Sequence, residues 1–560
     1  MLTPPRSVSL RALVPHATFA LTLAAAACSA GKTNDTNNGA PTDASAGDGA
    51  IHTDGGFAAD LGVDEGADTY TYAPPTPQTV ITAGTPSDAP TKFGGTASSD
   101  AGNAPSIVYP ADGALIPPNM GTLEFHFLPG TGNTLFEIAF ESPNIDLKVY
   151  TTCTPVGAGC VFSPDAAAWS KLTSATRGAS MITWTVRGSD GTAGGAVGAS
   201  ASQKIGFAAE DIKGGLYYWN AGAGATMRYE FGVSGKNGEM YLNAMTAGVP
   251  TCIGCHELSR KGDKIVEGYS IPMPTGFNVY DVATRTPTIQ KQGTGNFFAW
   301  APDGTKLLAS TGSTMVLLDG TSGAALPGGA NQATMPTWSP DGSTIVYVRE
   351  TAGQIPVGSP GVSQGQLMTL SWNGSTLLTG KTLVPYAGQN NYYPAFAPDS
   401  QLVAFNRSSQ NSYDAPDAQV WVVKADGSGA PLQLSNASPS GGRGDSWPKW
   451  TPTVQQYQGH PLFWITFSSR RAYGLRLNTA APTSSTPGTA QIWMAAVDPT
   501  LVAQGKDPSF PAFWLPFQDT GSGNHIAQWV LTVARKPCKT AADCNGGETC
   551  ANSLCVPAIQ

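Results

Sequence analysis

The sequence has little charge and no long, uninterrupted apolar stretch. Only 12% of its 560 residues are charged, and the net charge of -8 is spread without a basic cluster. A nucleic-acid partner requires clustered Lys and Arg, so this class of partner is excluded. The apolar run at 12–27 is interrupted by Pro15 and His16, and it is too short and too weakly apolar for a membrane-spanning helix.

The sequence also lacks a catalytic constellation. GVSQG at 361–365 has the spacing of a nucleophile elbow, but it lies in a Gly-, Ser- and Gln-rich stretch with no hydrolase domain after it. RGDS at 443–446 contains an adhesion tripeptide that is short enough to occur by chance. Asp303, Asp341 and Asp399 each follow a Pro at a turn, so we expect them to hydrogen-bond their own backbone. None of these residues supports an enzyme.

What the sequence has is turns and a repeated phrase. The 66 Gly and 44 Pro favour an all-β chain over long amphipathic helices. One phrase recurs as AWAPDGTKLLAS at 299–310, TWSPDGSTIVYV at 337–348, AFAPDSQLVAFN at 395–406 and KWTP at 449–452. Each copy predicts a strand, a tight turn and a second strand, and a further strand-turn phrase follows each copy. A period of roughly 40 to 60 residues with four strands per period is typical of a β-propeller.

This phrase resembles the W-S-P-D-G repeat of TolB-type propellers over about 207–533. The shared positions are the aromatic residues (Trp300, Trp338, Phe396, Trp450) and the prolines (Pro302, Pro340, Pro398, Pro452). Asp399-Ser400 and Thr453-Val454 depart from the Asp-Gly turn, so we expect these two hairpins to turn differently. ELSRKGDKIVEG at 257–268 is a worn copy. We expect a propeller at 207–535. Counting the strand-turn phrases that follow the copies gives six blades (five to seven), and HIAQWVLTV at 525–533 is expected to close the ring.

The N-terminal 104 residues predict export and a tether. Arg6 and Arg11 precede the apolar run, which ends in small residues at Cys28. This order is that of a secretory signal at 1–28, and the Cys resembles the acylated residue of a bacterial lipoprotein. Ala25 departs from the lipoprotein pattern, so cleavage without a lipid is the alternative. The stretch 29–104 has few large apolar residues and predicts a disordered tether. We therefore expect a protein of the bacterial cell envelope, facing the periplasm or held at the outer membrane.

Two further modules flank the propeller. Short alternating strands at 105–206 predict an Ig-like β-sandwich, in which Cys153 and Cys160 form a local disulfide and His126 is a packed strand residue. The tail at 536–560 is too short to build a core, so we expect a knot with two disulfides among its four cysteines (Cys538, Cys544, Cys550, Cys555). A zinc site is the alternative, disfavoured by the missing paired C-x-x-C spacing. The connectivity of the knot stays open.

One motif could hold a cofactor. Cys252, Cys255 and His256 in TCIGCHELS match the C-x-x-C-H attachment pattern of c-type haem, with His256 as the axial iron ligand. The alternative is a Cys252 to Cys255 disulfide or a pair of thiols. We expect the motif on a propeller edge or on a loop over the ring. Three nearby methionines (Met240, Met245, Met273) offer a second axial ligand, and we favour Met273. Against a haem, the residues around the motif are small.

Two functions follow from the sequence. The first is an exported, membrane-tethered binding or scaffold propeller whose face or central channel contacts a protein, a peptide or a glycan. The second is electron transfer through a covalent haem at Cys252, Cys255 and His256.

Overall fold

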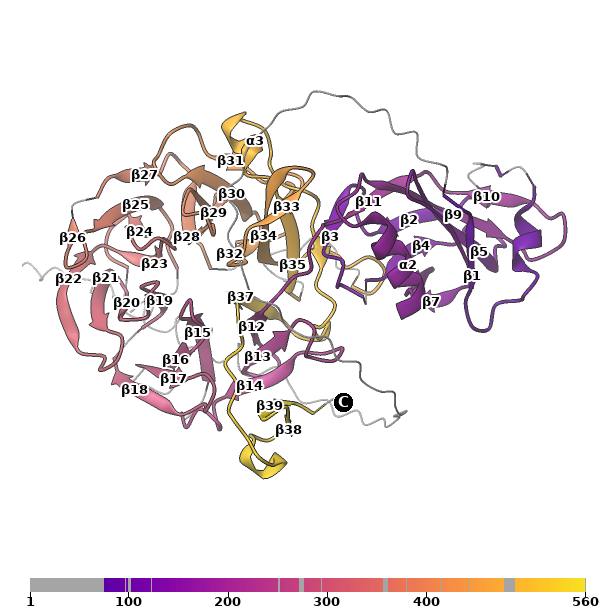
Figure 1. Cartoon of the computed structure of the whole chain (residues 1–560). Coiled ribbons are helices and arrows are strands. Elements are labelled where there is room, and N and C mark those ends of the chain that lie inside the picture. Colours follow the sequence, from indigo (N-terminus) through magenta and orange to yellow (C-terminus); the bar gives the residue numbers. More distant parts are fainter. Residues whose placement is uncertain are drawn as a thin grey trace, which may run out of the picture.

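The structure is a computed structural model. It describes residues 75–558, except 96, 99–101, 122, 250–251, 271–275, 294, 356–360, 379, 414, 442 and 478–488. Over these residues the chain forms a β-sandwich beside a ring of β-sheets (Figure 1). The predicted signal segment with Cys28, most of the predicted tether, and Met273 lie outside the described residues. No helix in the described part of the chain is long and apolar enough to cross a membrane.

The sandwich has one sheet of seven strands and one of four. The larger sheet has the order β1-β6-β5-β9-β11-β3, with β10 also paired to β9: β1 (Gln78–Ile81), β3 (Ala114–Ile116), β5 (Leu135–Ser142), β6 (Ile145–Thr152), β9 (Ile182–Ser189), β10 (Val197–Ala199) and β11 (Gln203–Phe207). The smaller sheet has the order β2-β4-β8-β7: β2 (Ser106–Tyr109), β4 (Phe125–Leu128), β7 (Thr154–Val156) and β8 (Gly159–Phe162). Aromatic side chains fill the space between the sheets, since the ring of Phe125 lies 5.4 Å from that of Phe140 and 5.0 Å from that of Trp184.

The sandwich begins earlier than the predicted boundary at residue 105. β1 pairs in parallel with β6, from Gln78 opposite Leu147 to Ile81 opposite Tyr150. Phe93, in the short 3-10 helix η2 (Ala89–Phe93), is buried with its ring 5.6 Å from that of Tyr150. A four-residue edge strand and a single Phe hardly change the composition of a polar stretch, which is why composition assigned this segment to the tether.

A helix that we did not anticipate from the sequence covers part of the sandwich. α2 (Ala166–Thr176) begins after Asp165, whose carboxylate accepts a hydrogen bond from the Ala168 amide at 2.7 Å. This is N-capping, which satisfies one of the unpaired amides of the first turn. The indole nitrogen of Trp169 donates to the Pro118 carbonyl at 2.8 Å, so the helix holds the chain segment that leads toward the propeller.

Six antiparallel sheets form the ring, which confirms the six-bladed propeller. From the innermost strand outward, blade 1 contains β37 (Asn524–Val530), β12 (Gly215–Asn220), β13 (Ala225–Glu230) and β14 (Glu239–Asn243). Blade 2 contains β15 (Cys252–Leu258), β16 (Lys264–Ser270), β17 (Gly276–Asp281) and β18 (Pro287–Gln292). Blade 3 contains β19 (Phe297–Trp300), β20 (Lys306–Thr311), β21 (Thr314–Asp319) and β22 (Ala325–Asn331).

Blades 4 to 6 carry the remaining strands. Blade 4 contains β23 (Thr334–Trp338), β24 (Thr344–Glu350), β25 (Gly365–Trp372) and β26 (Leu377–Leu378), with β27 (Thr382–Val384) also paired to β25. Blade 5 contains β28 (Asn390–Phe396), β29 (Leu402–Ser408), β30 (Gln419–Lys424) and β31 (Leu432–Gln433). Blade 6 contains β32 (Ser446–Trp450), β34 (His460–Ser469), β35 (Gln491–Val497) and β36 (Phe513–Trp514), with β33 (Gln455–Tyr457) paired to β34. A short helix, α3 (Thr500–Ala503), follows β35.

The C-terminal strand of the propeller closes the ring. β37 pairs with β12 from Gly215 opposite Val530 to Asn220 opposite Asn524. Blade 1 therefore combines three strands from the beginning of the propeller with one from its end, as the sequence of 525–533 predicted. β37 covers the edge of β12, which would otherwise be open to pairing with another chain.

The Asp side chains of the repeated phrase act within their own turns, as predicted. The carboxylates of Asp303, Asp341 and Asp399 each accept a hydrogen bond at 2.9 Å from a backbone amide two residues later. One expectation was wrong, because the turn at Asp399-Ser400 does not differ from its neighbours. Ser400 has φ 63° and donates its amide to the Ala397 carbonyl at 3.0 Å, as Gly304 does to Ala301 at 2.8 Å. A residue other than Gly can adopt this conformation at a cost of roughly 1–2 kcal/mol.

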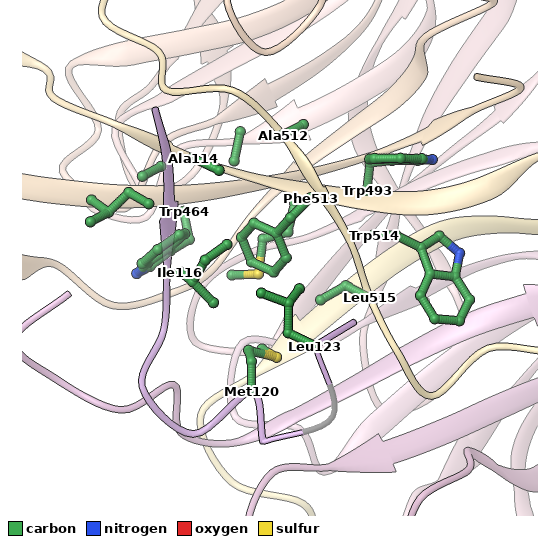
Figure 2. Close-up of a cluster of buried hydrophobic side chains, with 14 of the residues drawn as sticks. Ala114, Ile116, Met120, Leu123, Trp464, Trp493, Ala512, Phe513, Trp514 and Leu515 are labelled. Carbon is green, nitrogen blue, oxygen red and sulfur yellow. The ribbon is translucent and has the colours of Figure 1, made fainter. Parts of the chain in front are cut away.

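One apolar core joins the sandwich to blade 6. Side chains from the segment after β2 pack on β34, β35 and the chain around β36 (Figure 2): Ala114, Ile116, Met120 and Leu123 against Trp464, Trp493, Ala512, Phe513, Trp514 and Leu515. Beside this core, Glu124 accepts hydrogen bonds from Arg476 at 2.6 and 2.7 Å and from the Tyr473 hydroxyl at 2.9 Å. His126 is fully buried next to Glu124, which agrees with the packed role predicted for it.

Disulfides hold the two predicted cysteine loops. Cys153 and Cys160 are bonded, as expected. In the tail the pairs are Cys538 with Cys550 and Cys544 with Cys555, which settles the connectivity that the sequence left open. The tail is built from η3 (Ala541–Asp543), β38 (Glu548–Ala551) and β39 (Leu554–Pro557), and it packs beside blade 1 (Figure 1).

Candidate functional site

Six side chains face the axis of the ring from equivalent positions of the innermost strands. They are Cys255, Phe297, Met335, Tyr393, Trp447 and Ile526, and they line a small hollow on the axis. All except Phe297 have a φ between 49° and 58°, in the left-handed region. The strand pairing shifts register at each of these five places. A β-bulge redirects a side chain, so the bulges turn these five side chains toward the axis. Such backbone conformations cost on the order of 1–3 kcal/mol each, and they cluster at functional sites.

Aromatic rings from three blades meet in this hollow, which we call the axial chamber. The rings of Tyr393 and Trp447 are stacked with their centroids 3.6 Å apart, and Phe297 lies 5.9 Å from each of them. Since these residues come from blades 5, 6 and 3, the contact spans the axis. Met335 and Ile526 are buried beside them, so the wall of the chamber is largely apolar.

A polar layer lies two residues further along the same strands. The Glu257 carboxylate accepts hydrogen bonds from the Lys449 ammonium at 2.9 Å and from the Gln528 side-chain amide at 2.6 Å. These residues belong to β15, β32 and β37, the innermost strands of three neighbouring blades. All three line both the axial chamber and a second hollow on the same axis. They therefore form a charge-paired layer between the two spaces.

The second hollow, which we call the funnel, opens on the side of the repeated hairpins. Four prolines of the repeated phrase line it (Pro302, Pro340, Pro398, Pro452), together with the aromatic residues of that phrase. At the equivalent position of blade 2 the residue is Arg260. Among the described residues no carboxylate pairs with Arg260, and partial burial lowers the pKa of its guanidinium. The funnel thus combines prolines and aromatic rings with polar groups and the positive charge of Arg260.

The C-x-x-C-H motif lies on the axis rather than on a propeller edge or a loop over the ring. Cys252, Cys255 and His256 belong to β15, the innermost strand of blade 2. The expectation was wrong because CIGCHEL is itself a strand, and the worn repeat after it is its hairpin turn. Cys255 forms no disulfide and lines the axial chamber.

Burial keeps the groups around this motif neutral. The Cys255 thiol has its pKa raised to about 11 by burial and by the nearby Glu267 carboxyl. Burial lowers the pKa of His256 to about 4 and raises that of Glu267 to about 8. Glu267, opposite His256 on β16, accepts a hydrogen bond from the Thr226 hydroxyl at 2.7 Å. Neither a thiolate nucleophile nor a charged imidazole is therefore present at neutral pH.

A haem does not fit the motif in this conformation. The His256 side chain is 3% exposed, and its Nε2 lies 3.3 Å from the Tyr217 carbonyl oxygen, although its Nδ1 has no hydrogen-bond partner. Phe297, Tyr393 and Trp447 fill the axis in front of Cys255. Attachment would therefore require β15 to leave its blade.

The other candidate residues lie in environments that do not support the functions suggested by their motifs. The GVSQG segment precedes β25 and has no helix after it, so it is not a nucleophile elbow. Asp445 of RGDS is 1% exposed and accepts a hydrogen bond from Arg471 at 2.7 Å, which hides the tripeptide. The sulfurs of Cys538, Cys544 and Cys555 lie within 4.8 Å of one another, but each belongs to a disulfide. A disulfide sulfur is not a thiolate ligand for zinc.

The comparisons with known proteins give likeness of fold without a family. No protein-family model matches the chain, and no curated protein sequence matches it. Among solved structures, TolB from Acinetobacter baumannii is similar with 11% identity and a TM-score of 0.36, over 65% of this chain and 85% of that one. A putative TolB from Agrobacterium tumefaciens has 15% identity and a TM-score of 0.32, over 55% of this chain and 89% of that one. The β-propeller domain of the Trilobed protease from Pyrococcus furiosus has 9% identity and a TM-score of 0.28, over 56% and 78%.

Sequence reasoning missed the polar residues of the channel. Glu257, Lys449 and Gln528 stand at one position of the repeat, where blades 3, 4 and 5 have Ala299, Thr337 and Ala395. Arg260 lies in the worn copy at 257–268, where it replaces the proline of the repeated phrase. Comparing the blades column by column would have found both sets, because they are the charged or amide-bearing departures from the repeat.

Proposed function

We propose that the protein is an exported binding propeller that receives a segment of a protein or peptide ligand in its axial funnel. The observation that carries the proposal is the layered channel, in which prolines and aromatic rings surround the unpaired Arg260 above a polar floor of Glu257, Lys449 and Gln528. Ligand sites combine apolar surface with a few polar groups that fix orientation. The funnel has both, and it collects loops from every blade around one axis.

The charges of the funnel suggest which part of a ligand enters it. Arg260 can pair with a carboxylate, because guanidinium and carboxylate form strong bidentate hydrogen bonds. The prolines of blades 3 to 6 offer flat apolar contact to the rest of an extended segment. Lys449 is already neutralised by Glu257, so the floor selects by hydrogen bonding rather than by net charge. A segment with an acidic group beside apolar residues fits best.

Site-specific photo-crosslinking tests this proposal in cells. A photoreactive phenylalanine replaces Pro340 at the funnel or, as the matched control in the same blade, Leu378 on β26. Leu378 is 46% exposed on the outer side of its blade. We expect a discrete crosslinked product from position 340 and none from position 378. Equal products from both positions, or a product from 378 alone, would move the binding site to the outside of the ring.

Export with a lipid on Cys28 is part of the same proposal. It rests on the signal-like order of 1–28 and is supported by three disulfides within the described part of the chain, since disulfides persist in oxidising compartments. Mass spectrometry of the mature protein should find an acylated Cys28 as its first residue, and Cys28→Ser should release the protein from the membrane. An unmodified N-terminus elsewhere would contradict lipidation.

Covalent haem at Cys252, Cys255 and His256, with Met273 as a second axial ligand, stays a prediction from the motif alone. The unpaired His256 Nδ1 is the one feature of the site that favours a further ligand. A pyridine haemochrome spectrum of the mature protein, made in a host that attaches haem, separates the two functions. We expect colourless protein whose mass includes no haem, whereas a Soret band that disappears in Cys255→Ala would establish electron transfer as the better interpretation.

A further inference from the structure

The cysteine-rich tail makes a buried ionic contact with two blades of the ring. Glu548, at the start of β38, has a side chain that is 4% exposed. Its Oε1 accepts hydrogen bonds from Arg228 of blade 1 at 2.8 Å and from Arg285 of blade 2 at 2.7 Å. Arg228 is 2% exposed, and Arg285 is 11% exposed. One carboxylate of the tail therefore joins two neighbouring blades.

The ring supplies a prepared socket for this carboxylate. The guanidinium carbons of Arg228 and Arg285 lie 5.2 and 5.0 Å from the ring centre of the buried Tyr241. Tyr241 donates its hydroxyl to the Val282 carbonyl at 2.9 Å, and Glu239 accepts from Arg228 at 2.6 Å. Tyr241 thus contacts both arginines, and Glu239 holds Arg228. The geometry is that of a charge-assisted recognition site for a carboxylate.

The tail presents Glu548 rigidly. Asn545 donates to the second carboxylate oxygen of Glu548 at 3.0 Å, and the disulfide between Cys538 and Cys550 closes the loop that contains both residues. Although burial alone would raise it, the charges of Arg285 and Arg228 hold the pKa of Glu548 below its ordinary value. The carboxylate is therefore ionised and paired at neutral pH.

The same tail is attached to the strand that closes the ring. Five residues after β37, Arg535 pairs with Glu230 at the end of β13, and it donates to the Cys555 carbonyl at 3.0 Å. The chain thus leaves the closing strand, contacts blade 1 at Glu230, and then reaches across to blade 2 through Glu548. Because the tail follows β37, separation of β37 from β12 would break both contacts.

We propose that the tail is a latch that holds the ring closed. Its docking surface is the socket formed by Arg228, Arg285 and Tyr241, and Glu548 in this socket stabilises the closure of the ring between β37 and β12. The closing pairs of β37 with β12 are backbone hydrogen bonds between segments about 300 residues apart in sequence. A tail that is bonded to both blades opposes the separation of β37 from β12, and the two disulfides of the tail keep the tail folded. This role is independent of any ligand in the funnel.

Hydrogen exchange of the full-length protein measured by mass spectrometry tests the latch. In Glu548→Gln we expect several-fold faster exchange in β12, β13 and β37, with no change in blades 4 and 5. Glu141→Gln is the matched control, since Glu141 is exposed on the sandwich. Treatment of the wild-type protein with a phosphine reductant should produce the same pattern around blades 1 and 2. Because the reductant also opens the Cys153 to Cys160 bond, Cys153→Ser with Cys160→Ser serves as its control.

The outcomes separate a latch from an appendage. If exchange rises only within 536–558 in Glu548→Gln and after reduction, the tail is an appendage and the proposal is wrong. If Glu548→Gln does not accumulate, the reduced wild-type protein gives the answer by itself. A double-mutant cycle of Glu548→Gln with Arg285→Gln should be less than additive in denaturation midpoint, because each change removes the same contact. Full additivity would also overturn the proposal.

Discussion

Blades 3, 4 and 5 keep the repeat, whereas blades 1, 2 and 6 depart from it. At the channel position the regular blades have Ala299, Thr337 and Ala395, and the irregular ones have Gln528, Glu257 and Lys449. The irregular blades are contiguous around the ring, so their departures meet as one hydrogen-bonded layer. The comparison teaches that the regular blades supply the frame of this propeller, and that its polar chemistry lies where the repeat is lost.

The largest effect is expected from damage to a regular blade. Phe405→Ala removes a fully buried ring from β29 in blade 5, which should cost about 3–5 kcal/mol of the free energy of unfolding. Chemical denaturation with two probes checks the value. Crosslinking from position 340 should persist in protein that remains folded. A cost below about 1 kcal/mol would mean that blade 5 is not part of the cooperative frame.

In blade 2, which is one of the irregular blades, a buried carboxyl group should make the stability depend on pH. Glu267 is fully buried with its pKa raised to about 8, so the folded protein holds a proton that the unfolded chain loses near pH 4.5. The stabilisation that Glu267 contributes is fully present below its pKa in the unfolded chain. It declines as the pH rises toward about 8, by up to about 1.4 kcal/mol per pH unit. His256, with its pKa lowered to about 4, acts in the opposite direction between about 4 and 6.5.

Glu267→Gln should remove this decline and make the protein more stable than wild type at pH 8. Urea denaturation at about pH 7.2, 7.6 and 8 measures it above the range in which His256 mainly titrates. Parallel stability curves for the two proteins over this range would show that Glu267 is ionised in the fold and that the account of blade 2 is wrong.

The polar layer should respond moderately to the loss of one member. Lys449→Met leaves the Glu257 carboxylate with Gln528 alone, which should cost about 1–3 kcal/mol, since a partly buried charge loses its partner. Adding Glu257→Gln should recover most of this loss. Thermal unfolding of the single and double variants gives the comparison, and failure of the second change to compensate would argue against a coupled layer.

The smallest effect concerns reactivity rather than stability. Since the pKa of the Cys255 thiol is raised to about 11 from 9.0, alkylation at pH 8 should be roughly 100-fold slower in the folded protein than in the unfolded chain. Iodoacetamide labelling followed by peptide mapping distinguishes Cys255 from Cys252. Labelling of Cys255 at the rate of a free thiol would show that the axial chamber is open.

Local patterns predicted the frame of the molecule well. The aromatic-Pro-Asp phrase specifies a strand and a turn by itself, so the hairpins, the blade number and closure by 525–533 followed from the residues. The Asp399-Ser400 turn was misjudged because Ser pays only a modest cost for the conformation that Gly adopts freely. β1 was missed because a four-residue edge strand is recognisable only through its partner β6.

The site was predicted less well, because it depends on contacts between distant residues. Glu257 and Lys449 are 192 residues apart, and nothing local to either residue marks the pair. C-x-x-C-H was singled out because it matches a known pattern, but the pattern contains no information that CIGCHEL is an axial strand. The Glu548 socket escaped notice for the same reason, since its arginines lie more than 250 residues before it.

The most direct test of the account compares one charge in an irregular blade with one in a regular blade. Crosslinking from position 340 is quantified in the wild-type background, in Arg260→Ala and in the matched variant Lys306→Ala of blade 3. The account predicts that Arg260→Ala lowers the yield about tenfold, as expected for loss of a charged hydrogen bond worth about 1.5 kcal/mol, while Lys306→Ala leaves it unchanged. Equal yields in all three proteins would contradict the claim that the departures from the repeat carry the binding function.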